Sequence, residues 1–384
     1  RCAGAGQLKF MKQPYIWIVI AVLAAGGYMA FTADKGGSTK ADTIRIGYVG
    51  PFTGPVAGSS GEDVANGWKL AVAERPEIAG KKVEMVYEDD ACDPKQAASA
   101  AQKLLNVDKV SIVINGVCSG SMLSMAPITE AAKAILFTPV STSPKITDAG
   151  DYVFRTSASS VSTGKAMSSF LSKMGYTSIA ILFENADYTV GLKDAFAADF
   201  SAMAGNSILG SEGVNSKDYD VRTQLTKLTA LKPRMIVAVM NSTVTANAFI
   251  KQGKDLGLKI PVVGNEYFGF REVVTNPDAE GIYIAQYAYD ASSAAFAGFL
   301  ARYEAAYGTK PSQEIYAAQP FDGYNVLADA IGKCGSAEPA CVRDALYATK
   351  GYQGITGTIT IDANGDTDRA FSIRRIKGGA LTDI

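Results

Sequence analysis

The sequence of 384 residues contains no histidine. Without histidine, neither a Ser-His-Asp nor a Cys-His catalytic arrangement can be built, and most zinc sites lose their usual ligand. Carboxylate or lysine chemistry would survive, so this absence weakens the case for an enzyme without closing it. A phosphate loop is also missing, because Gly50, Gly54 and Gly58 do not follow the G-x-G-x-x-G spacing.

An excess of positive charge is missing as well. The chain has 37 Lys and Arg against 38 Asp and Glu, for a net charge of −1, whereas a nucleic-acid-binding domain is usually basic. With 47% hydrophobic and 20% charged residues, the composition is that of an ordinary globular protein. The length suits two lobes better than one small domain.

Near the N-terminus, the apolar stretch 15–31 follows the basic Lys12 and precedes a polar segment. Seventeen residues is long for the core of a signal peptide and short for a membrane-spanning helix. No lipobox cysteine follows it, because Cys2 lies before the run. We expect export to the periplasm or cell surface, with cleavage or retention as an anchor left open. Residues 1–10, before Met11, resemble an upstream extension.

Residues 110–144 predict a strand, a helix and a second strand. Small hydroxyl residues follow each strand: Ser119 and Ser121 after the first, then Ser141, Thr142 and Ser143 after the second. Ligands of open parallel sheets sit at the carboxyl ends of the strands, where helix N-termini offer free N–H groups to a carboxylate. The alternative is that these residues only cap helices and turns, which is their commonest role.

The rest of the chain alternates in the same way. Four βα units run to about residue 154, the stretch 155–164 has no periodicity and indicates a crossing, and a second α/β series fills 165–285. A helix-rich return precedes two β segments, 357–361 and 370–376. The turn between them, 362–368, has the Asp and Asn spacing of a calcium loop but Arg374 at the closing position, so an Asn-Gly hairpin turn explains it more simply.

Four of the five cysteines suggest two disulfides. Cys92 and Cys118 each follow a predicted strand at the same sheet edge, and Cys334 and Cys341 flank one short loop. We therefore predict the pairs 92–118 and 334–341 among three possible pairings, leaving Cys2 unpaired. Buried free thiols are the alternative, which an oxidising compartment makes less favourable.

Several stretches resemble a known family. The segments YEDDACDPKQAASAAQKLLN (87–106) and IRIGYVGPFTGPVA (44–57), the Cys118-Ser119 pair and the segment 139–144 are similar to type I periplasmic binding proteins. The similarity is greatest to the leucine/isoleucine/valine-binding branch of ABC import systems, and it covers nearly everything from residue 44 onward.

This resemblance implies two doubly wound α/β lobes joined by a three-strand hinge. Residues 1–41 would form an extension, signal or anchor segment and linker. Residues 42–158 plus 287–361 would form lobe 1, and residues 159–286 plus 362–384 would form lobe 2. Hinged closure around a ligand is the motion that such an architecture permits.

The resemblance also implies an amino-acid site. Ser119 matches a serine that receives the ligand α-carboxylate, and Thr142 matches a threonine that contacts both ends of the ligand. Ser141 occupies a position whose backbone groups make the contact. Glu266 matches the acid that pairs with the ligand ammonium, and Tyr188 matches an aromatic residue of lobe 2 that closes over the ligand.

Two departures affect the ligand's side chain. Branched-chain members of the family carry a large aromatic residue where this sequence has residues 58–60, and tyrosines where it has residues 240–242. The pocket is then wider or more polar, unless Tyr267, Phe268 or Tyr287 fills the space. Leucine-like ligands come first, followed by a larger or polar amino acid.

The leading hypothesis is a monomeric solute-binding protein that delivers an amino acid to the membrane permease of an ABC importer. It needs no cofactor, metal or nucleic acid. The second hypothesis is an amino-acid- or amide-sensing domain in signalling. An enzyme is the third, and no nucleophile–base pair, phosphate loop or metal cluster in the sequence supports it.

Overall fold

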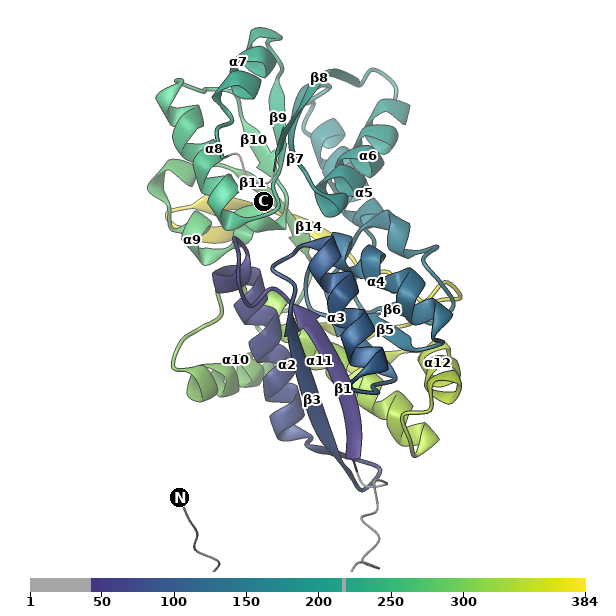
Figure 1. Ribbon diagram of the computed structural model, residues 1–384. Helices are drawn as coiled ribbons and strands as arrows, with labels where there is room; N and C mark the ends of the chain where they lie inside the picture. Colours follow the sequence, from purple (N-terminus) through teal and green to yellow (C-terminus); the bar gives the residue numbers. More distant parts are fainter. Residues whose placement is uncertain (1–42, 216–218) are drawn as a thin grey trace, which may run out of the picture. The chain divides into compact units, whose positions relative to one another are not determined.

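The computed structural model describes residues 43–215 and 219–384. The predicted signal or anchor segment, the extension 1–10 and Cys2 lie outside the described residues. Two large β-sheets, each with helices on both faces, and one small two-stranded sheet make up the described part (Figure 1). This confirms the α/β fold with two lobes; lobe 1 below is the half built on the first sheet, and lobe 2 the half built on the second.

The first sheet has six strands among the described residues, in the order β2-β3-β1-β4-β5-β6. All neighbours are parallel except β2 and β3. The strands are β1 (Thr43–Gly50), β2 (Glu77–Ile78), β3 (Lys81–Asp89), β4 (Ile112–Asn115), β5 (Ile135–Thr138) and β6 (Val153–Arg155). The carboxyl ends of β4 and β5 lie side by side, which brings the hydroxyl-rich loops after them together.

Alternate residues of these strands face two different helix layers. Ile112 and Ile114 of β4 belong to one buried cluster and Val113 to another, as the two-residue period of a strand requires. The first cluster includes residues of α2 (Glu62–Glu74), α10 (Ala294–Tyr307), α11 (Glu314–Cys334) and α12 (Pro339–Tyr347). The second includes residues of α3 (Pro94–Asn106) and α4 (Ser119–Ala131).

The second sheet has seven strands in the described part, in the order β15-β14-β11-β10-β9-β7-β8. They are β7 (Ser178–Asn185), β8 (Ser207–Asn215), β9 (Met235–Val239), β10 (Val262–Gly264), β11 (Tyr283–Tyr287), β14 (Phe371–Lys377) and β15 (Ala380–Asp383). The strands β14 and β15 are antiparallel and the rest parallel. The helices are α5 (Ser160–Lys173), α6 (Asp187–Ala202), α7 (Arg222–Ala230), α8 (Thr243–Asp255) and α9 (Arg271–Val274).

The chain passes between the sheets three times: after β6, after β11 and before β14. The first crossing is shorter than the sequence pattern indicated, because α5 begins at Ser160 rather than near residue 165. The Ser159 hydroxyl accepts a hydrogen bond from the Val161 N–H and caps this helix. Small polar residues fill its first turns, so apolar periodicity could not reveal its start.

The last two β segments do not form one hairpin. The strand β13 (Gly357–Ile359) pairs with β12 (Tyr352–Gly354), whereas β14 joins the second sheet, so the turn 362–368 belongs to the third crossing. The Asp362 carboxylate accepts hydrogen bonds from the N–H groups of Asn364 and Asp366, and Ile361 pairs with Thr367 across the turn.

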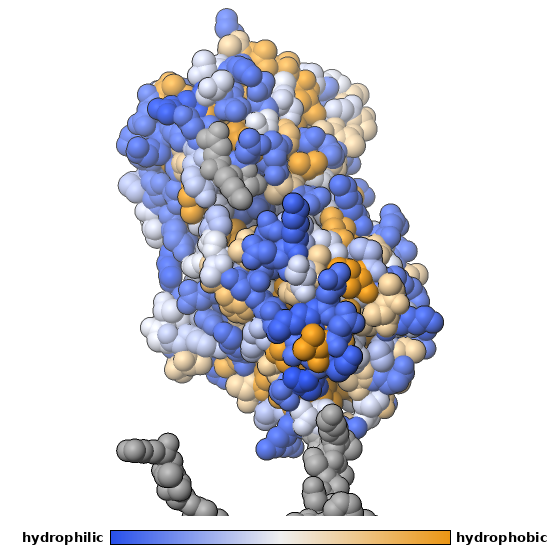
Figure 2. All heavy atoms as spheres, viewed as in Figure 1, coloured by the Kyte–Doolittle hydropathy of each residue, from blue (hydrophilic) through white to orange (hydrophobic). Residues whose placement is uncertain are grey.

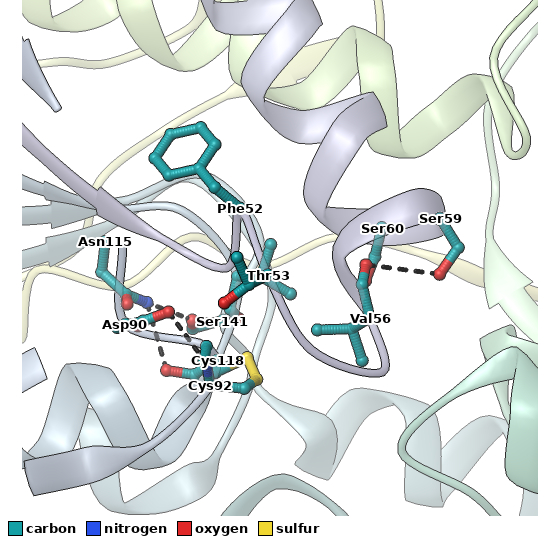
Figure 3. The surroundings of a disulfide bond; sticks show 12 residues. Phe52, Thr53, Val56, Ser59, Ser60, Asp90, Cys92, Asn115, Cys118 and Ser141 are labelled. Carbon is teal, nitrogen blue, oxygen red and sulfur yellow. Dashed lines mark hydrogen bonds between the residues drawn. A yellow bond between two sulfur atoms is a disulfide. The ribbon is translucent and has the colours of Figure 1, made fainter. Parts of the chain in front are cut away.

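Both predicted disulfides are present. Cys92 and Cys118 are joined with a Cα–Cα distance of 5.6 Å, and Cys334 and Cys341 with a distance of 5.9 Å. The first bridge ties the loop after β3 to the residue that precedes α4 (Figure 3). The helix α3 follows this loop, with Asp93 as its N-cap and Pro94 as its first residue.

Hydrophilic residues cover most of the face seen in Figure 2, with hydrophobic residues scattered among them. No helix among the described residues is both long enough and apolar enough to cross a membrane.

Candidate functional site

One small cavity is lined by all five residues that the resemblance singled out. Its volume is about 20 Å³, and it lies where the carboxyl ends of β4 and β5 face the loops after β7, β9 and β10. The lining residues are Val117, Cys118, Ser119, Val140, Ser141, Thr142, Tyr188, Asn241, Glu266, Tyr267 and Tyr316.

Ser119 is the first residue of α4, so it stands at the positive end of that helix and beside its unbonded N–H groups. Its hydroxyl accepts a hydrogen bond of 3.2 Å from the Ser143 N–H. The disulfide at Cys118 holds the entry to this helix (Figure 3). This corner of the cavity offers hydrogen-bond donors and partial positive charge, which suit a carboxylate.

Ser141 and Thr142 continue the same wall. The Ser141 hydroxyl donates to the Val117 carbonyl and accepts from the Asn115 amide, at 2.7 Å each. This side chain therefore connects the loop after β5 to the loop after β4. The Thr142 hydroxyl lies 3.0 Å from Ser160 Oγ and lines the cavity. The expectation that backbone groups rather than the side chain of Ser141 contact a ligand stays a prediction.

Glu266 lies on the opposite wall, directly after β10, and its side chain is 2% exposed. One carboxylate oxygen accepts a hydrogen bond of 3.4 Å from the Tyr316 hydroxyl, and the other has no partner among the described residues. Burial raises the pKa of Glu266 above its ordinary value. No lysine or arginine lines the cavity, so the described lining leaves this buried carboxyl group without a cation.

Three tyrosines surround Glu266. The hydroxyl of Tyr188 accepts a hydrogen bond of 2.9 Å from the Asn265 amide, and the ring of Tyr267 stacks on Phe270 with centroids 5.3 Å apart. Burial raises the pKa of Tyr188 and Tyr316 well above the ordinary value, so both remain neutral at physiological pH. The tyrosines supply apolar faces together with neutral hydroxyl groups.

Of the three aromatic residues proposed to fill the side-chain space, only Tyr267 lines this cavity. Its hydroxyl lies 3.3 Å from Ser60 Oγ, so a residue of the changed segment 58–60 contacts it. Phe268 instead packs edge-on against Phe249, and Tyr287 packs against Phe371. The sequence analysis missed Tyr316, because a tyrosine early in a long apolar helix is indistinguishable from a core residue.

A second cavity of about 310 Å³ adjoins the first and shares Cys118, Ser119, Tyr188 and Asn241 with it. Its other lining residues include Val56 of the first loop and Asp187 at the start of α6. Lys145 forms an ion pair of 3.7 Å with Asp187 and so links the two lobes beside this cavity.

The sequence model of one family, described as periplasmic binding protein, matches residues 43–380. The chain belongs to the periplasmic binding protein family. Members of this family bind solutes, and the chain is therefore a binding protein rather than an enzyme. The third hypothesis of the sequence analysis is thereby excluded.

Individual members of the periplasmic binding protein family are similar over most of the chain. The leucine-, isoleucine-, valine-, threonine- and alanine-binding protein of Pseudomonas aeruginosa is 28% identical, over 91% of this chain and 92% of its own. The structure of the leucine-binding protein LivK of Thermotoga maritima matches with a TM-score of 0.81 and 27% identity, over 88% of this chain and 97% of its own.

A further periplasmic binding protein structure carries a different ligand. The solute-binding protein of an ABC transporter from Rhodopseudomonas palustris, in complex with 3,4-dihydroxybenzoic acid, matches with a TM-score of 0.80 and 25% identity. The match covers 89% of this chain and 96% of that protein. Relatives of similar likeness therefore differ in what they bind, and the choice of ligand depends on the cavity of this chain.

Proposed function

We propose that this protein is the solute-binding component of an ABC importer and that it binds an α-amino acid between the walls of the small cavity, whose volume of about 20 Å³ must increase when the ligand enters. The proposal depends mainly on one observation, which is that two walls of the cavity suit opposite charges. The start of α4 at Ser119 suits an anion, and the buried Glu266, without a cation in the lining, suits a cation. A zwitterion satisfies both walls at once.

Each end of the ligand then has its own partners. The ligand carboxylate accepts hydrogen bonds from the N–H groups at the start of α4 and from the hydroxyls of Ser119 and Thr142. The ligand ammonium pairs with Glu266 and donates to the Tyr188 hydroxyl. Ser119 and Thr142 belong to lobe 1, and Tyr188 and Glu266 to lobe 2, so the ligand binds best when both lobes contact it and shifts the population toward that state.

The side chain of the ligand faces Tyr267, Tyr316 and Asn241 in this proposal. The two rings favour a leucine-like or aromatic side chain. Asn241 and the Ser60–Tyr267 hydroxyl pair add polar groups, which accommodate a polar side chain. A branched-chain amino acid is the first choice of ligand, and a larger or polar amino acid the second.

An aromatic carboxylic acid is the second candidate, because three tyrosines line the cavity and the Rhodopseudomonas palustris protein was crystallised with one. Such a ligand has no ammonium group. Its carboxylate would leave Glu266 unpaired, or would have to coexist with it as a like charge in a buried site. Glu266 therefore favours the amino acid.

Delivery to a permease in the membrane requires export, and the two disulfides are compatible with an oxidising compartment. An amino-acid-sensing domain in signalling would use the same cavity, so the two roles differ only in the partner protein. Transport is the proposal favoured by the likeness to the transporter-associated relatives.

A thermal-unfolding screen tests the proposal. A ligand that binds only the folded state raises the melting temperature by mass action. The panel contains the twenty standard amino acids together with benzoate, 4-hydroxybenzoate and 3,4-dihydroxybenzoate. We expect the largest shift from an amino acid. A shift from the aromatic acids alone would favour the second candidate, and no shift from any amino acid would contradict the proposal.

A further inference from the structure

The first crossing contacts the loop that carries Thr142. Three side chains of the crossing and of the start of α5 donate hydrogen bonds to three successive carbonyl groups of the loop. Ser157 Oγ donates to Ser141 O at 2.7 Å, Ser160 Oγ to Thr142 O at 2.8 Å, and Arg155 Nη1 to Ser143 O at 2.9 Å. The Ser160 N–H also donates to Thr142 O. Every carbonyl of residues 141–143 is therefore held by the crossing.

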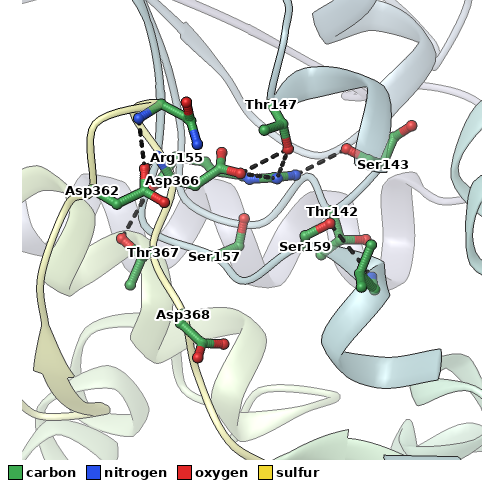
Figure 4. A network of polar contacts seen from close by, with 12 residues as sticks. Thr142, Ser143, Thr147, Arg155, Ser157, Ser159, Asp362, Asp366, Thr367 and Asp368 are labelled. Atoms are coloured by element: carbon green, nitrogen blue, oxygen red, sulfur yellow. Dashed lines mark hydrogen bonds and ion pairs between the residues drawn. The ribbon is translucent and has the colours of Figure 1, made fainter. Parts of the chain in front are cut away.

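Arg155 differs from the two serines because it also reaches the third crossing. Its side chain is fully buried, and Nη2 lies 2.5 Å from Asp366 Oδ2 and 2.8 Å from Thr147 Oγ1 (Figure 4). The Thr147 hydroxyl donates to the same Asp366 oxygen at 2.7 Å. One guanidinium group thus joins the ligand loop, at Ser143, to the turn 362–368.

The backbone reinforces this junction. The Arg155 N–H donates to Gly365 O, and Thr367 Oγ1 donates to Arg155 O. Gly365 has φ +78°, and a Cβ atom there would lie 2.4 Å from Val153 O, so only glycine permits this approach of the turn to β6. The two crossings move together wherever these contacts persist.

We propose that Arg155 is a positioning residue for ligand binding, which couples the first and third crossings to the loop 141–143. The inference rests on the proposed function, because it concerns the same cavity. Arg155 does not line that cavity. It acts through Ser143, whose N–H donates to the Ser119 hydroxyl, and thereby sets the spacing between Thr142 and the start of α4.

The coupling has a physical consequence for affinity. Rotation of the lobes changes backbone dihedral angles in the crossings, and Arg155 transmits such a change to Ser143 through its guanidinium group. A ligand that fixes the positions of Thr142 and Ser119 must then stabilise one arrangement of the crossings. By reciprocity, that arrangement must raise the affinity for the ligand by the same factor. Loss of the Arg155 contact to Ser143 should weaken binding although no ligand contact is removed.

The test compares Arg155→Lys with Arg369→Lys. A lysine at position 155 retains a charge for Asp366, but it cannot also reach Ser143 O and Thr147. Arg369 lies in the third crossing as well, and its Nη2 donates to Thr356 Oγ1 at 2.8 Å, outside the ligand loop. Leucine affinity is measured by calorimetry and its dissociation rate by stopped flow, both below the melting temperature of each variant.

We expect Arg155→Lys to lower leucine affinity by about tenfold, mainly through faster dissociation, with a stoichiometry of about one per chain. We expect Arg369→Lys to keep the wild-type affinity within about twofold. Wild-type affinity in Arg155→Lys would overturn the inference, as would an equal loss in Arg369→Lys. Absence of amino-acid binding to the wild type would instead overturn the proposed function together with this inference.

Asp366→Asn provides a second measurement if Arg155→Lys does not fold. It keeps the size of the side chain and removes the charge that fixes the guanidinium group opposite Ser143. We expect a loss of leucine affinity in the same direction, with faster dissociation. Unchanged affinity in this variant would contradict the coupling between the third crossing and the site.

Discussion

At the scale of single residues, Glu266 determines the chemistry of the site. A buried ionised carboxylate without a cation is unfavourable, so Glu266 either takes up a proton, as its raised pKa reflects, or pairs with a positive charge that enters the cavity. The sequence indicated Glu266, Ser119, Ser141, Thr142 and Tyr188 through the family resemblance, and the structure brings all five to one cavity. Their roles toward a ligand remain a proposal.

Replacement of Glu266 by glutamine should weaken amino-acid binding by about 1.5–3 kcal/mol, because a hydrogen bond to a charged group is lost. The same change should not lower the melting temperature of the unliganded protein, since it removes a buried charge. Titration calorimetry and thermal unfolding measure the two effects. Asp322→Asn, which changes a buried acid that lines neither cavity, is the control, and equal losses of affinity in both variants would show that Glu266 has no specific role in binding.

The affinity should also depend on pH through Glu266. Burial raises the pKa of its carboxyl group in the unliganded protein, and an ammonium ligand favours the ionised form. The affinity for an amino acid should therefore be highest above the raised pKa, where Glu266 is ionised. It should fall as the pH drops through that pKa, by up to about tenfold per pH unit. Calorimetry across this range should show the fall in the wild type, and an identical profile in Glu266→Gln would assign it to another group.

At the scale of elements, α2 is a helix that the sequence reveals, because Val64, Trp68 and Ala71 repeat at helical spacing along it. It placed the start of α5 too late, where the helix depends on the Ser159 cap rather than on apolar residues. It joined β13 and β14 through one turn, although their partners lie in different sheets. Pairing between strands distant in sequence cannot be deduced from a local pattern.

Removal of the Cys92–Cys118 bridge should affect both stability and binding. With a sequence separation of 26, the bridge contributes about 3.5 kcal/mol by loop entropy, and it also holds the start of α4 beside Ser119. The Cys334–Cys341 bridge, with a separation of 7, contributes about 2.4 kcal/mol and is remote from the cavity.

Serine replacement of each pair, followed by urea unfolding and leucine titration, separates the two effects. We expect both double variants to lose stability. Only the variant without the 92–118 bridge should lose affinity. A loss of affinity of similar size without the 334–341 bridge would mean that the effect is global.

At the scale of the whole molecule, the described residues form two lobes with three crossings, and the proposed ligand partners are divided between the lobes. The family resemblance predicted this arrangement, whereas the polar network that joins two crossings at Arg155 could not be predicted. Asp366 lies 219 residues from Thr147 and 211 from Arg155, and no local pattern in the sequence indicates that the three side chains meet.

Leucine should shift the population of lobe arrangements toward the one in which both walls contact the ligand. Small-angle X-ray scattering of the free and saturated protein should therefore show a smaller radius of gyration with ligand. Scattering curves that coincide, under conditions where calorimetry confirms saturation, would mean that binding does not depend on lobe movement.

The central claim is that the cavity holds a zwitterion with its ammonium group at Glu266. Titration of the wild-type protein with leucine and with 4-methylpentanoate, which has the same carbon skeleton but no amino group, tests this most directly. The account predicts measurable binding of leucine and at least about a hundredfold weaker binding of 4-methylpentanoate, because the buried carboxyl group would be left without its cation. Equal affinities for the two ligands would contradict it.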